Sequence, residues 1–112
     1  MFNLQTTPRR QRPNPAEARF NQVEQEIEHT ARRVSRRHRI LADRLKRVAL
    51  SRSSELMEAM QSSDDLERIA RVDALIGKGV RLSPEDATDP DVAQLLASAS
   101  ELSWVDQARR SN

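Results

Sequence analysis

The chain has 112 residues, of which only three are aromatic, namely Phe2, Phe20 and Trp104. This size and composition predict one small domain without a large core, and the lack of cysteine excludes disulfides and thiolate metal sites. No apolar run is long enough for a signal peptide or a membrane span, so we expect a soluble protein of the cytoplasm or of a virus particle.

Charge is distributed unevenly along the chain, although the formal net charge is only +2. Residues 31–52 are strongly basic, whereas residues 16–30 and 53–76 are acidic overall. Blocks of opposite charge predict charged partners, either within the molecule or outside it.

The first 14 residues contain three arginines and two prolines. We expect them to form a flexible basic arm with the apolar residues Phe2 and Leu4 near its tip.

Residues 16–76 contain neither glycine nor proline, and β-branched and aromatic residues are sparse there, which predicts helix. Asn14 and Pro15 predict its start, because Asn is a favoured N-cap and Pro fits the first turn, and Glu17 is placed to reach back to the cap. A heptad seam, with the four–three spacing of a coiled coil, comprises Phe20, Ile27, Ala31, Val34, His38, Leu41, Leu45 and Val48. These signals predict one amphipathic helix over 15–50, about 50 Å long.

Two more boundaries follow. Serines at 51–54 predict a bend or short turn, although a continuous helix over 15–61 stays open. The run SSDD at 62–65 is a second cap signal, and it opens a helix that Gly77 or Gly79 ends.

The last third contains two helix starts, with Pro84 and Pro90 at first helical positions. They are too close for two long helices, so we predict a single turn at Pro84. After Pro90 we predict a short amphipathic helix to about Leu102, followed by Trp104 and Val105 and then a polar tail.

These elements predict an all-α fold in which a long N-terminal amphipathic, coiled-coil-like helix precedes two or three shorter helices, with an extended N-terminal arm. The predicted divisions are an arm at 1–14, a helical hairpin or bundle at 15–79, and a short helix and tail at 80–112. Because the seam is longer than so small a chain can cover, we expect it to be buried in an oligomer or a larger complex.

The sequence offers little for catalysis or metal binding. Its two histidines, His29 and His38, are nine residues apart and lack the spacing of a metal pair on a helix. The IGKG at 76–79 resembles a phosphate loop only superficially, because Val72 stands where that loop needs glycine. We expect no enzymatic activity, no cofactor, no metal and no small-molecule substrate.

The most informative feature is an Arg-rich face on the side of the first helix that the seam leaves free. Neighbours one turn apart, such as Arg32 and Arg36, repel each other, so we expect acidic groups to offset the repulsion. The predicted polyanion-binding residues are Arg32, Arg33, Arg36, Arg37, Arg39, Arg44, Lys46 and Arg47.

Three kinds of partner are possible for the Arg-rich face. The acidic segment 53–76 can fold back on it, but carries too little charge to neutralise it. Nucleic acid is the second, since seven of the eight cations are arginine, which pairs with phosphate in bidentate fashion, although aromatic residues for base stacking are scarce. An acidic surface of another protein is the third.

Both ends of the chain also carry apolar residues suited to docking in a neighbour. These are Phe2, Leu4, Leu102, Trp104 and Val105. Trp104 can equally well cover the small core.

We therefore expect an assembly or adaptor protein that joins a larger complex, or a homo-oligomer, through its seam and ends, with its basic face on an acidic partner. The alternative is a protein that binds DNA or RNA without sequence readout, with an affinity that falls steeply as salt rises. The architecture is similar to that of small helical proteins of phage packaging or secretion machinery, but no residue motif carries this likeness.

Overall fold

The structure is a computed structural model, and it describes residues 14–111. The predicted arm up to residue 13, with Phe2 and Leu4, lies outside the described residues. The described part is all-helical, as the sequence predicts. None of its helices is both long and apolar enough to cross a membrane.

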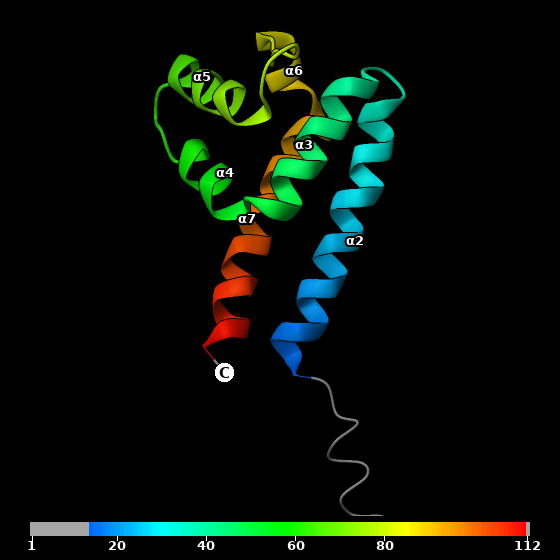
Figure 1. Cartoon of the computed structure of the whole chain (residues 1–112), viewed down its shortest axis with the longest axis vertical. Helices are drawn as coiled ribbons and strands as arrows, with labels where there is room; N and C mark the ends of the chain where they lie inside the picture. The colour runs from blue at the N-terminus through cyan, green and yellow to red at the C-terminus, as the bar shows by residue number, and fades with distance from the viewer. Residues whose placement is uncertain (1–13, 112) are drawn as a thin grey trace, which may run out of the picture.

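The two longest helices lie side by side and form the main body of the fold (Figure 1). The elements are α2 (Pro15–Ser35), α3 (Arg39–Ser51), α4 (Ser53–Met60), α5 (Asp65–Ile76), α6 (Pro84–Thr88) and α7 (Pro90–Arg110). The main body is the pair α2 and α7, and α3 turns back to pack on both of them. The shorter α4, α5 and α6 lie on the other side of α3 from α2 in this view, with α4 and α6 packed on α7.

Short polar residues start the long helices, as the sequence predicts. Asn14 accepts a hydrogen bond from the backbone N–H of Ala16 at 2.8 Å, and the Asp89 carboxylate caps α7 in the same way. Glu17 does not reach back to the Asn14 cap. It forms an ion pair with Arg109 in the last turn of α7, at 3.4 Å, and so ties the two long helices together.

The prediction of one helix over 15–50 is wrong, because the chain turns at residues 36–38 between α2 and α3. The Val34 carbonyl accepts the backbone N–H groups of both Arg37 and His38, and His38 leaves helical geometry with φ −146° and ψ 87°. A straight helix would leave its apolar stripe in water. Folding back buries the two halves of the stripe within one chain.

The heptad seam is therefore divided between two helices and covered internally. Ile27, Val34, Leu41 and Leu45 are almost completely buried in the single core, which they share with α7 residues such as Leu95. The expectation that the seam needs another chain to cover it is wrong for this reason.

Two predicted seam residues are only half-buried, and of these Phe20 packs against the edge of the core. His38 is half-buried in the turn and does not lie in a helix interface. Phe20 is half-buried, and its ring lies 3.8 Å from the guanidinium carbon of Arg109, a cation–π contact.

The other boundaries agree with the sequence in part. The predicted break at 51–54 occurs at Arg52, so residues 15–61 form three helices. Within residues 14–111 there are six helices, more than predicted, and α7 runs to Arg110 without the expected tail after Leu102. Contacts of Arg109 with Phe20 and Glu17 hold its last turns on α2.

Gly77 ends α5 in a backbone conformation that only glycine adopts readily, with φ 90° and ψ −179°. A Cβ atom there would lie 2.9 Å from Nη1 of Arg44, the atom that donates to the Ile76 carbonyl at 2.8 Å. We expect Gly77→Ala to lower the free energy of unfolding by about 1–3 kcal/mol, because it adds backbone strain and disturbs this bond. Gly79→Ala has a similar φ but open space around it, so urea denaturation should show a smaller loss.

Candidate functional site

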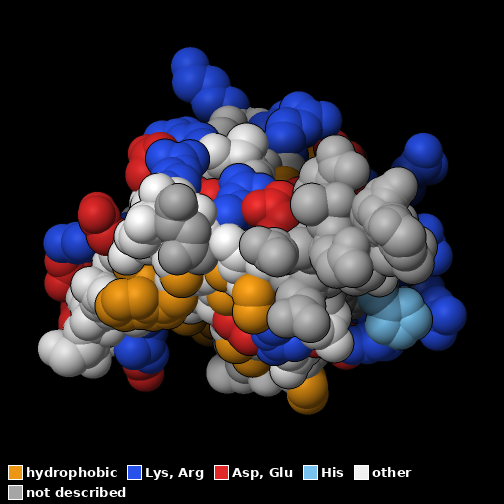
Figure 2. Space-filling view, turned by 90° about the horizontal axis from the view of Figure 1, so that it is seen from below, with side chains coloured by type: hydrophobic (Ala, Val, Ile, Leu, Met, Phe, Trp, Pro, Cys, Tyr) orange, Lys and Arg blue, Asp and Glu red, His pale blue; other side chains and the backbone are white. Residues whose placement is uncertain are grey.

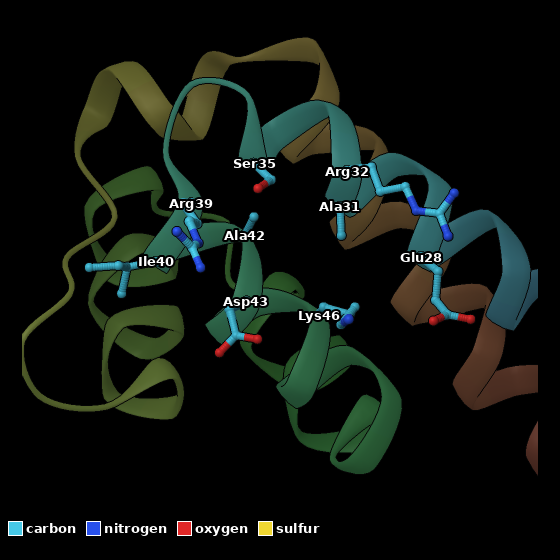
Figure 3. A pocket seen from close by; sticks show the side chains of 9 residues that line it. All are labelled: Glu28, Ala31, Arg32, Ser35, Arg39, Ile40, Ala42, Asp43 and Lys46. Atoms are coloured by element: carbon cyan, nitrogen blue, oxygen red, sulfur yellow. The ribbon is translucent and has the colours of Figure 1, made fainter.

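A groove between α2 and α3 is lined by part of the predicted Arg-rich face (Figure 3). Its volume is about 500 Å³. We call it the basic groove, and its lining residues are Glu28, Ala31, Arg32, Ser35, Arg39, Ile40, Ala42, Asp43 and Lys46. The groove exists because the turn at 36–38 sets the two halves of the basic segment side by side.

Two of the eight predicted cations are neutralised by acids of the C-terminal third. Arg33 pairs with Asp91 at 3.0 Å, and Arg37 pairs with Asp86 at 3.0 Å and with Asp89 at 3.1 Å. The internal partner is thus the region of α6 and the start of α7, and these pairs do not involve the 53–76 segment that the sequence suggested. They fix the α2–α3 turn on the rest of the fold.

Asp86 is the most enclosed acid of this cluster, with 7% of its surface exposed. Burial by itself would raise the pKa of Asp86, but hydrogen bonds from Arg37 and Ser83 outweigh it and lower the pKa below its ordinary value. Ser83 and Asp86 also form the capping box of α6, in which each side chain accepts the backbone N–H of the other residue. The hydrogen bond with Asp86 in turn raises the pKa of Arg37.

Two further cations have partners close in sequence or at a helix end. Arg47 pairs with Asp43 one turn earlier at 3.0 Å, on the exposed surface of α3. Arg44 donates to the Ile76 carbonyl and so caps α5. Both cations therefore have a structural explanation.

The other four predicted cations form no ion pair with an acid among residues 14–111. They are Arg32, Arg36, Arg39 and Lys46. All except Arg36 line the basic groove, and Arg36 is exposed in the turn at its end. Three of the four unpaired cations thus line one groove.

The rest of the groove is not purely basic. Its interior is built from small side chains of both helices, Ala31, Ser35 and Ala42, as Figure 3 shows. Ile40 lies at the edge of the groove, where its side chain points away from these small residues, and it is 57% exposed. The carboxylates of Glu28 and Asp43 also line the groove, so the surface has mixed charge with an excess of cations.

The predicted terminal docking residues behave differently from one another. Leu102 is 1% exposed and belongs to the core, so its predicted role in docking is wrong. Val105 is half-buried, and Trp104 is 61% exposed on α7, away from the basic groove.

Sequence reasoning missed a second groove, which is apolar and lies between α5, α6 and α7. Its volume is about 400 Å³. Leu66 and Ile69 keep the apolar spacing of their helix, so the sequence pattern alone did not distinguish groove residues from core residues.

Among residues 14–111, no cluster of three or more His, Asp or Glu side chains is arranged to hold a metal ion. Comparison of the chain with known protein families, with characterised proteins and with solved structures gives no match. The case for function therefore depends on the surfaces just described.

Proposed function

We propose that this protein is a small helical adaptor that binds an acidic segment of another protein in the basic groove. The observation that supports this most is the group of three cations, Arg32, Arg39 and Lys46, that line one groove without acidic partners of their own. On α5, by contrast, Arg68 and Arg71 each form an ion pair with an acid of the same helix.

The remaining lining favours a protein partner over nucleic acid. Glu28 and Asp43 would repel a phosphate backbone laid along the groove. The small residues of the interior let the backbone of a partner helix approach closely, and Ile40 offers an apolar contact beside the charges. The matching partner is a helix that is acidic overall, with an apolar residue for Ile40 and a basic one for Glu28.

Replacing Arg32 and Lys46 with Gln tests this proposal, with a labelled amphipathic helical peptide of that design as the probe. We expect the peptide affinity, measured by fluorescence anisotropy, to fall roughly five- to thirtyfold, since two ion pairs are lost. The matched control is Arg71→Gln with Arg110→Gln, which removes the same charge from α5 and α7. An equal loss in both variants would mean that net charge alone attracts the peptide.

Glu28→Gln separates the protein partner from nucleic acid. If the partner is the proposed helix, Glu28→Gln removes the attraction between Glu28 and the basic residue of the peptide, so the affinity for the peptide should fall. For duplex DNA or RNA it removes a repulsion, so affinity should rise and should depend steeply on salt. If the protein binds nucleic acid more tightly than the peptide, and Glu28→Gln raises its nucleic-acid affinity, the nucleic-acid alternative replaces the proposed function.

A further inference from the structure

Ser35 lies at one end of the basic groove, where α2 stops and the turn at 36–38 begins (Figure 3). It is half-buried, and its hydroxyl has no hydrogen-bond partner among residues 14–111, whereas Ser51 and Ser111 at other helix ends bond back to carbonyls one turn earlier. No enclosed side-chain oxygen in this part of the chain lacks a partner. The unpaired Ser35 oxygen is therefore in contact with solvent.

The cations around Ser35 have no acid to pair with in the described part of the chain. Arg32 is one turn earlier on α2, Arg36 follows directly, and Arg39 begins α3 beside the same groove. At the opposite end of the molecule, basic and acidic side chains lie next to each other (Figure 2), and the arginines at the end of α7 form ion pairs there. An anion at Ser35 would relieve the repulsion among the three unpaired arginines.

The residues before Ser35 match the charge pattern that one class of protein kinase selects. Arg32 and Arg33 stand three and two residues before the serine. Basophilic kinases place acidic side chains opposite arginines at these two positions. Among all serines and threonines of the chain, Ser35 alone has arginine at both. The hydroxyl at the end of the groove is thus also the one that this pattern selects.

We propose that Ser35 is a phosphorylation site and that its phosphorylation weakens binding in the basic groove. In the modifying step the Ser35 oxygen attacks the γ-phosphorus of a nucleoside triphosphate held by a basophilic kinase. A new O–P bond forms, the bond from the γ-phosphorus to its bridging oxygen breaks, and the nucleoside diphosphate leaves with that electron pair. The hydroxyl proton passes to a carboxylate of the kinase. The effect on binding rests on the proposed function, whereas the modification site does not.

A phosphate on Ser35 competes with the acidic partner for the same cations. It carries a charge of about −1.5 to −2 at neutral pH and three acceptor oxygens. The side chains of Arg32, Arg36 and Arg39 are exposed and can turn towards it. Their charge-assisted hydrogen bonds outweigh the unfavourable position of an anion at the C-terminal end of α2. The phosphate also repels the acids of the partner.

Access of a kinase to Ser35 requires the last turn of α2 to open. Kinases bind the substrate segment in an extended form, so Arg33 has to leave Asp91, and Val34, which is 1% exposed, has to leave the core. Because the helix already ends at Ser35, only this one turn has to open. We therefore expect the full chain to be phosphorylated more slowly than a peptide of residues 28–42, but to completion.

The test uses the full chain, ATP and a basophilic serine kinase chosen by its activity on the peptide of residues 28–42. Mass spectrometry should show a single phosphate per chain, mapped to Ser35, and Ser35→Ala should take up none. The phosphorylated chain should bind the acidic helical peptide of the proposed function roughly tenfold or more weakly, measured by fluorescence anisotropy. Ser35→Ala should show the same affinity before and after the kinase reaction.

A double variant separates recognition by the kinase from binding of the phosphate. Arg36→Gln with Arg39→Gln keeps the arginines before Ser35, so the kinase should still modify it. In the native chain, phosphorylation should raise Tm, measured by circular dichroism, because it pairs the crowded arginines. In the double variant this gain should disappear, since less positive charge offsets the phosphate at the end of α2.

Two results would overturn the inference. One is a full chain that stays unmodified at Ser35 while the peptide of residues 28–42 is phosphorylated. The other is a phosphorylated chain that binds the acidic peptide as tightly as the unmodified chain does. If the unmodified chain did not bind the acidic peptide at all, the proposed function would be wrong, and the mapping of the phosphate and the change in Tm would still test the Ser35 site.

Discussion

Replacing Leu45 with Asp is expected to remove a large part of the stability of the fold. Leu45 is completely buried on α3, where it packs in the one core shared by α2, α3 and α7. A carboxylate there loses its water without gaining a cation, which we estimate to cost about 4 kcal/mol or more, against a typical total stability of about 5–15 kcal/mol. Thermal melting followed by circular dichroism should show a large fall in Tm or no cooperative transition.

The control for Leu45→Asp is Ile40→Asp, which places the same charge on the same helix at an exposed position. It should leave the melting curve almost unchanged. Because the interface around Leu45 lies within one chain, the loss in Leu45→Asp should be the same at all protein concentrations. Retained helicity in Leu45→Asp would show that α3 does not pack with this face inward.

Replacing Asp86 with Ala is expected to give the second large effect. Asp86 accepts hydrogen bonds from Arg37 and from the backbone and hydroxyl of Ser83. Their loss removes the capping box of α6 and the main anchor of the α2–α3 turn, with an expected cost of roughly 2–3 kcal/mol at neutral pH. In a domain of this size that corresponds to a fall in Tm of about 10 °C. Glu85→Gln, one residue earlier on an exposed position, is the matched control.

The stabilisation by Asp86 should also depend on pH. The pKa of Asp86 is lowered in the folded protein, so its ionised form is the one that favours folding. Its contribution is fully present above the unfolded pKa, near about 4, and is lost as pH falls through the folded pKa. The difference in unfolding free energy between the native chain and Asp86→Asn should therefore be constant near neutral pH and shrink in acid. If this difference in unfolding free energy increased at acid pH, the ionised form of Asp86 would not be the form that favours folding.

Local sequence signals located the starts of α2, α5, α6 and α7, since these depend on residues only two or three positions apart, but they missed the start of α3. Asn14 caps α2, and Gly77 ends α5, because the cap and the left-handed backbone are properties of the residues themselves. The charge of the basic segment was also evident in the sequence. The sequence did not show which cations remain unpaired, because Arg33 and Arg37 form ion pairs with acids about fifty residues further along the chain.

The sequence by itself determined that this protein is helical and which face of each helix is apolar, because both follow from propensity and from the 3.6-residue repeat. Only the tertiary structure decided that the heptad seam turns back at residues 36–38. The periodicity of the apolar residues is the same whether the seam is covered by another chain or by α7. In the structure the seam is buried within one chain, against α7. That turn also created the basic groove and left Trp104, which the sequence could place equally well inside or outside, on the exposed face of α7.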